Sequence, residues 1–131
     1  MRLNHIGVIV KNISDSVTYY ETILGLKKVS EIYVDTRQEV ELVFLETGIE
    51  GITIELISPT SSSSPAYNAL IRGGGINHLC YEVNDINGKI DYLRRQGCKL
   101  VRSPLPAIAF GNRLVAFLYS SNLGLIELLE C

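Results

Sequence analysis

His5-Ile6-Gly7-Val8 and Ile54-Glu55-Leu56-Ile57 decide the fold of this chain, because both stretches recur as His78-Leu79-Cys80-Tyr81 and Ile126-Glu127-Leu128-Leu129. The separation from histidine to glutamate is 55 − 5 = 50 residues in the first half and 127 − 78 = 49 in the second. A repeat of this kind indicates two copies of one structural module.

The first half predicts one helix and four strands. Asn12-Ile13-Ser14-Asp15 offers a helix cap, Gly25 closes the helix, and apolar residues recur between them at helical spacing. These apolar positions are Val17, Tyr20, Ile23 and Leu24. Short segments rich in branched apolar residues predict the strands, at 3–10, 27–34, 40–47 and 52–58.

The second half repeats that order. Asp85 caps a helix that ends at Gly97, and its apolar stripe consists of Ile86, Ile90 and Leu93. The strands are expected at 77–83, 98–102, 114–119 and 125–129, and residues 105–111 are expected to form a loop. Each half is therefore predicted to have the element order βαβββ.

The stretch between the halves is rich in serine and proline, which favours an exposed spacer, with 66–71 as a possible short helix. We therefore expect a single α+β domain, with module one at 1–58, the linker at 59–75 and module two at 76–131. The duplication favours a curved mixed sheet, with one metal-centred cleft shared between the modules.

Composition excludes several classes of protein. The chain has 131 residues and a formal net charge of −2 without a basic face, so nucleic acid is not an expected partner. Its apolar runs are too short for a membrane span, and its start does not resemble a signal peptide. Three cysteines at no metal-like spacing favour reduced thiols and a cytoplasmic location.

The two histidines and their matched glutamates carry the chemistry. Side chains alternate between the faces of a strand, so Glu55 and Glu127 point away from their apolar neighbours. A buried carboxylate is unfavourable unless it is paired. His5, Glu55, His78 and Glu127 together form a set of nitrogen and oxygen donors suited to one divalent cation: zinc, nickel, cobalt or manganese.

Leu3-Asn4-His5-Ile6-Gly7, Leu24-Gly25-Leu26 and Ile54-Glu55-Leu56-Ile57-Ser58-Pro59 resemble the vicinal-oxygen-chelate superfamily, which includes glyoxalase I, methylmalonyl-CoA epimerases, extradiol dioxygenases and antibiotic-resistance binding proteins. Gly75 to Ile86, Asn112 to Leu118 and Gly124 to Leu128 are similar to the epimerases. Glu39 stands where epimerases commonly have glycine. The resemblance implies metal ligands at His5, Glu55, His78 and Glu127, and it implies a homodimer.

The resemblance implies proton transfer next to a carbonyl in a small-molecule substrate, either an acyl-CoA or a glutathione thioester-type compound. Glu127 is the expected base, Glu55 is the second candidate, and Glu41 is a weaker one. A methylmalonyl-CoA epimerase-like reaction is the first expectation, and glyoxalase I (lactoylglutathione lyase) is the alternative. A binding or resistance protein without catalysis and an iron-dependent dioxygenase are further alternatives.

Overall fold

The computed structural model describes residues 1–48 and 51–131, which fall into two compact units. The N-terminal unit comprises His5–Asn77, and the C-terminal unit comprises Met1–Asn4 with His78–Cys131. The strand β1 (Arg2–Ile9) begins in the C-terminal unit and continues into the N-terminal one. Likewise, β6 (Gly75–Val83) lies at the boundary and belongs mostly to the C-terminal unit.

The N-terminal unit is a mixed sheet with a helix on one face. β1 pairs in parallel with β5 (Thr53–Pro59), and β5 pairs antiparallel with β4 (Val40–Glu46). Two short strands pair antiparallel with β4, namely β2 (Lys27–Lys28) and β3 (Tyr33–Asp35). The predicted strand at 27–34 is therefore two short strands rather than one.

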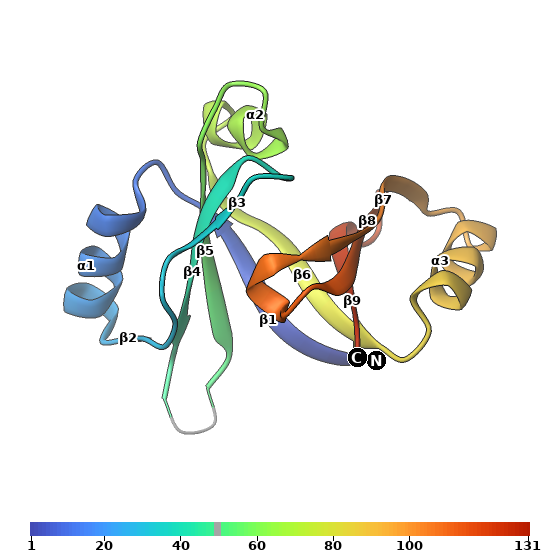
Figure 1. Ribbon diagram of the computed structural model, residues 1–131, viewed down its shortest axis with the longest axis horizontal. Coiled ribbons are helices and arrows are strands. Elements are labelled where there is room, and N and C mark those ends of the chain that lie inside the picture. The colour runs from blue at the N-terminus through green and yellow to red at the C-terminus, as the bar shows by residue number, and fades with distance from the viewer. Residues whose placement is uncertain (49–50) are drawn as a thin grey trace. The chain divides into compact units, whose positions relative to one another are not determined.

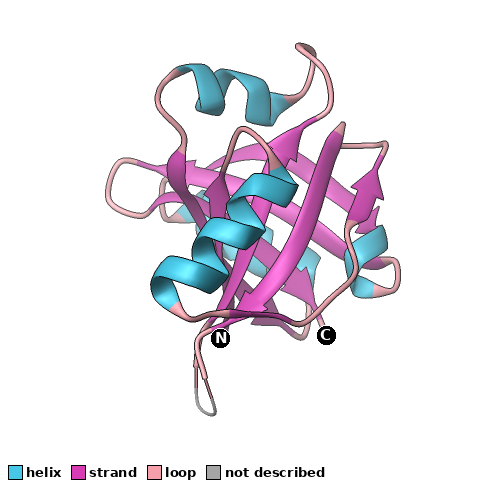
Figure 2. Cartoon of the chain, turned by 90° about the vertical axis from the view of Figure 1, so that its left-hand side faces the viewer, coloured by secondary structure: helices cyan, strands magenta, loops and turns pink. Residues whose placement is uncertain are grey.

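The helix α1 (Ile13–Leu24) begins where the sequence predicts it, because the Asn12 side chain accepts a hydrogen bond from the Asp15 amide at 2.9 Å. Gly25 ends the helix with a φ of 71°, a left-handed conformation that glycine adopts without a steric penalty. The helix packs along one face of the sheet of its unit (Figures 1 and 2). Its core against the sheet consists of Val8, Ile13, Val17, Leu26, Val43, Leu45 and Leu56.

Two apolar residues of α1 differ from the prediction. Ile23 and Leu24, expected on the inner stripe, are exposed, and Leu26 beyond the helix fills the core instead.

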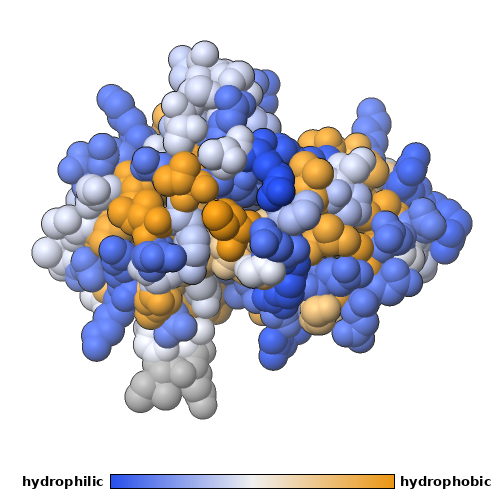
Figure 3. Space-filling view, viewed as in Figure 1, coloured by the Kyte–Doolittle hydropathy of each residue, from blue (hydrophilic) through white to orange (hydrophobic). Residues whose placement is uncertain are grey.

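The linker contains the helix α2 (Pro65–Ile71), which Ser64 caps by accepting a hydrogen bond from the Ala66 amide. Apolar side chains also reach the surface over the segment from β2 to β3, where Val29, Ile32 and Val34 are exposed (Figure 3).

The C-terminal unit repeats this architecture. β6 pairs in parallel with β9 (Gly124–Glu130), followed by antiparallel β8 (Arg113–Ser120) and β7 (Lys99–Ala107). The helix α3 (Ile86–Arg95) is capped by Asp85, which accepts from the Gly88 amide at 3.0 Å. β7 and the 3₁₀ turn at Ile108–Phe110 occupy most of the stretch that was expected to be a loop.

The predicted stripe of α3 packs against its own sheet. The core of this unit consists of Val83, Ile86, Ile90, Leu93, Cys98, Ala116, Leu118, Ile126 and Leu128. In each unit the sheet thus has a helix face, covered by α1 or α3, and a second face that we call the histidine face. None of the helices in the described residues is long and apolar enough to cross a membrane.

Candidate metal centre

The N-terminal unit brings His5 and Glu55 together on its histidine face. Leu56 packs against α1, so strand alternation directs Glu55 to the other side of the sheet. The His5 Nε2 atom lies 3.6 Å from the Glu55 Oε1 atom. Their residues are 0% and 4% exposed, so an imidazole and a carboxylate share a buried environment.

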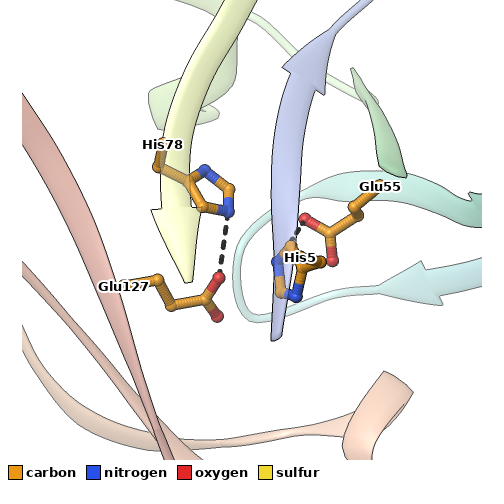
Figure 4. A group of neighbouring side chains, drawn as sticks. All are labelled: His5, Glu55, His78 and Glu127. Atoms are coloured by element: carbon orange, nitrogen blue, oxygen red, sulfur yellow. Dashed lines mark ion pairs between the residues drawn. The ribbon is translucent and has the colours of Figure 1, made fainter. Parts of the chain in front are cut away.

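The C-terminal unit brings His78 and Glu127 together in the same way. Ile126 and Leu128 pack against α3, so Glu127 points to the histidine face. The His78 Nε2 atom lies 3.0 Å from the Glu127 Oε2 atom, and both residues are 3% exposed. Figure 4 shows each histidine turned toward the glutamate of its own unit.

The two pairs arise from the same strand register. In the N-terminal unit, Glu55 is opposite Gly7, two residues beyond His5. In the C-terminal unit, Glu127 is opposite Cys80, two residues beyond His78. The repeat seen in the sequence therefore extends to the pairing of the strands, which places the same two functional groups together in both units.

A phenylalanine ring packs against the histidine of each pair, and neither phenylalanine was predicted from the sequence. The ring of Phe44 meets that of His5 edge to face, with centroids 5.7 Å apart and an interplanar angle of 70°. The rings of Phe117 and His78 are 5.4 Å apart at 88°. The repeat contained the signal, because 117 − 44 = 73 residues separate the phenylalanines and 78 − 5 = 73 separate the histidines.

Glu41, the weaker candidate base, does not lie on the histidine face. Phe44 and Glu55 are register partners and share the histidine face, whereas Glu41, three residues before Phe44, faces the helix side with Val43. This orientation removes Glu41 as a candidate base. Cys80 is fully buried on the histidine face and packs as a small apolar residue with Leu129.

Glu39, which stands where epimerases commonly have glycine, has a structural role. Glu39 has a φ of 55°, in the left-handed region that favours glycine. Its carboxylate accepts hydrogen bonds from the hydroxyls of Ser63 (2.7 Å) and Ser61 (2.9 Å). These bonds hold the pKa of Glu39 below its ordinary value. Glu39 thereby connects the turn before β4 to the serine-rich linker.

Glu82, a half-buried carboxylate on the same strand as His78, has different partners. Burial raises the pKa of Glu82, but hydrogen bonds from Asn4 and Arg2 and the charges of Arg2 and Arg113 outweigh burial and leave it below the ordinary value. The Asn4 amide lies 2.8 Å and the Arg2 Nε 3.0 Å from this carboxylate. Glu82 is thus bound to protein groups and anchors the start of β1 to β6.

Each His–Glu pair supplies one imidazole nitrogen and one carboxylate oxygen, and all four residues are buried. Zinc, cobalt, nickel and manganese accept this combination of donors in proteins. A divalent cation also offsets the charge of a buried carboxylate, which is otherwise unfavourable. The donors of the two units therefore fit the ions that the sequence predicts.

The chain belongs to the Glyoxalase/Bleomycin resistance protein/Dioxygenase superfamily, whose family model matches residues 4–117. It is 32% identical to the mitochondrial methylmalonyl-CoA epimerase of Dictyostelium discoideum, over 98% of this chain and 78% of that protein. It is 30% identical to the ethylmalonyl-CoA/methylmalonyl-CoA epimerase of Cereibacter sphaeroides, over 97% of this chain and 96% of that protein.

A solved structure agrees with these relatives. The crystal structure of methylmalonyl-CoA epimerase from Mycobacterium tuberculosis matches with a TM-score of 0.84 and 28% identity, covering 98% of this chain and 86% of that chain. The family and the α+β class expected from the sequence are confirmed. The comparisons also bear out the expectation of an epimerase-type enzyme over that of a glyoxalase.

Proposed function

We propose that this protein is a metal-dependent epimerase of methylmalonyl-CoA or a closely related acyl-CoA, with one divalent cation held by His5, Glu55, His78 and Glu127. The observation that carries the proposal is the buried His–Glu pair, which occurs with the same strand register in both units. The epimerase names of the relatives support the choice of substrate class.

A bound cation would favour removal of the α-proton. When bound, a divalent cation would supply positive charge near the thioester oxygen, where negative charge develops as the α-proton leaves. The protein contributes the rigid ligands: four buried side chains on strands rather than on loops. Strand positions hold ligand atoms more accurately than loop positions.

Epimerisation needs one group that removes the α-proton and a way to return a proton on the opposite face of the carbon. We assign the removal to Glu127 and the return to Glu55, because these two carboxylates lie on the histidine faces of the two units. On the same face of β4, the buried residues Val40, Leu42 and Phe44 are apolar and provide no acid or base.

The direct test is proton NMR of methylmalonyl-CoA in D₂O with the metal-loaded protein. We expect the α-proton signal to disappear, a chelator to stop the loss, and added metal to restore it. Glu127→Gln should slow the exchange by at least about 100-fold, the lower range for loss of a positioned base. Metal-loaded protein without exchange would contradict the acyl-CoA proposal, and the glutathione hemithioacetal would be the next substrate to test.

The proposal includes a homodimer in the cytoplasm. Sedimentation equilibrium of the metal-loaded protein tests the assembly, for which we expect twice the 14.5 kDa of one chain. A mass that stays at one chain across a range of protein concentrations would contradict the dimer.

A further inference from the structure

We infer that Phe44 and Phe117 are positioning residues that fix the ring planes of the two histidines toward the bound cation. The inference rests on the proposed metal site. It goes beyond that site because it assigns a role to two residues that donate no ligand atom.

The first observation is that the same contact occurs in both units. Each phenylalanine is the antiparallel register partner of the unit's glutamate: Phe44 is opposite Glu55 and Phe117 is opposite Glu127. Directly opposed side chains project from the same face of a sheet. The phenylalanine is thus on the strand next to the glutamate, and its ring reaches the histidine.

The second observation is the angle between the rings. At 70° and 88° the phenylalanine and histidine rings are close to perpendicular, which is a preferred arrangement for aromatic pairs. The terminal torsion of a histidine side chain has a broad energy profile, so the backbone does not fix the ring plane. A neighbouring ring that is packed perpendicular to the imidazole restricts this rotation.

The ring plane matters because it sets the direction of the Nε2 lone pair. Nε2 is the atom that faces the carboxylate in both pairs, so it is the atom that would bind the cation. Hydrogen-bonding groups that orient a metal ligand from outside the coordination shell change metal affinity by about 10-fold to 100-fold when they are replaced, and we take the lower end of this range for an apolar group. A phenylalanine has no polar atom, so its effect on the imidazole comes from packing alone.

The two units hold their phenylalanines differently. Phe44 is 8% exposed, and the ring of Tyr33 packs against it with centroids 6.4 Å apart. Phe117 is only half-buried. Phe117 therefore tolerates a change of its ring more easily, which makes it the better position for a conservative substitution.

The chain also offers matched controls. A leucine follows each phenylalanine, and alternation turns it to the helix face. Leu45 belongs to the core under α1, and Leu118 belongs to the core under α3; both are fully buried. Leu45→Val and Leu118→Val perturb the same strands without touching a histidine.

The experiment measures Co²⁺ affinity by competition with a chelator and the visible absorption spectrum of the bound Co²⁺. We expect Phe44→Leu and Phe117→Leu to weaken Co²⁺ binding by at least about 10-fold and to change the spectrum. Phe117→Tyr, which keeps the ring, should retain both properties. Leu45→Val and Leu118→Val should bind Co²⁺ within about 2-fold of the original protein.

Two results would overturn the inference: leucine variants that match the original protein in affinity and spectrum, or controls that lose as much affinity as the leucine variants. If the original protein binds no Co²⁺, the proposed metal site itself fails, and the positioning role fails with it. The behaviour of the original protein thus separates failure of the proposed function from failure of this inference.

Discussion

The proposed binding of one cation by all four side chains predicts that His5 and His78 are each indispensable for metal binding. Each unit has its own buried His–Glu pair, so the alternative is one weak site in each unit. Replacing His5 or His78 with alanine distinguishes these cases. With one shared ion, each substitution removes a ligand of the same site, whereas with two sites each substitution leaves the other site intact.

The expected rise in Tm on metal binding follows from the linkage between binding and folding. A ligand at 100 times its dissociation constant stabilises the folded protein by about 2.7 kcal/mol. Unfolding entropy is about 2.1 cal/mol/K per residue, so a chain of 131 residues has about 0.28 kcal/mol/K. The ratio of these values predicts that saturating metal raises the Tm by about 10 °C.

The assay is differential scanning calorimetry of the metal-free protein with and without Co²⁺, together with equilibrium dialysis for stoichiometry. We expect one ion per chain and an increase of about 10 °C, reduced to less than about 2 °C in His5→Ala and in His78→Ala. Glu41→Gln, on the helix side, is the control and should keep the full increase. Two ions per chain, or a histidine variant that keeps half the increase, would refute the shared site.

Three further predictions concern single side chains. Glu41→Gln should leave the epimerisation rate within about 2-fold, because Glu41 faces away from His5; a rate loss as large as that of Glu127→Gln would contradict this orientation. Hydrogen bonds from Ser63 and Ser61 lower the pKa of Glu39, so its charged form stabilises the fold above the ordinary pKa, and this contribution is lost as the pH falls through the lowered value. Glu39→Gln should therefore be less stable than the original protein at pH 7, and urea titrations should show the difference shrinking toward pH 3; a constant difference would exclude the charge as its cause. Ile86→Ala removes a fully buried side chain on the inner face of α3 and should lower the free energy of unfolding by about 2 to 5 kcal/mol; a loss below about 1 kcal/mol in urea titrations would contradict the packing.

The repeat predicted most of the architecture, because it fixed the order of elements twice. Asn12 and Asp85 cap the helices as expected, since a side-chain oxygen at that position satisfies an amide that the helix leaves free. The face on which Glu55 and Glu127 lie was predictable from alternation alone, because each is flanked by residues that pack under a helix.

The details that depend on strand register were not predictable. The spacings of 50 and 49 residues do not reveal that each glutamate lies opposite the residue two beyond its histidine. The repeat matches Phe44 with Phe117, but the pairing of the strands and the ring geometry are needed to show that both rings reach the imidazoles. The same limitation left Glu41 as a candidate base, because its face depends on how β4 pairs with β5.

Some boundaries of the strands were not predicted correctly from the local sequence. A loop was expected at 105–111, yet β7 runs through Ala107. Its pairing to β8 is irregular, and such irregularities accommodate the two prolines of this strand. Residues 27–34 have strand-like composition, but only two short segments pair with β4. In both cases pairing with the neighbouring strand decided the outcome rather than local propensity.

The proposed function of this protein is to invert the configuration of an acyl-CoA with the help of a bound metal. The most direct measurement starts from a single epimer of methylmalonyl-CoA and follows the epimer ratio over time with metal-free, metal-loaded and chelator-treated protein. We predict a nearly equal mixture of the two epimers with the metal-loaded protein and no change in the other two samples. A substrate that remains a single epimer with metal-loaded protein would contradict the account.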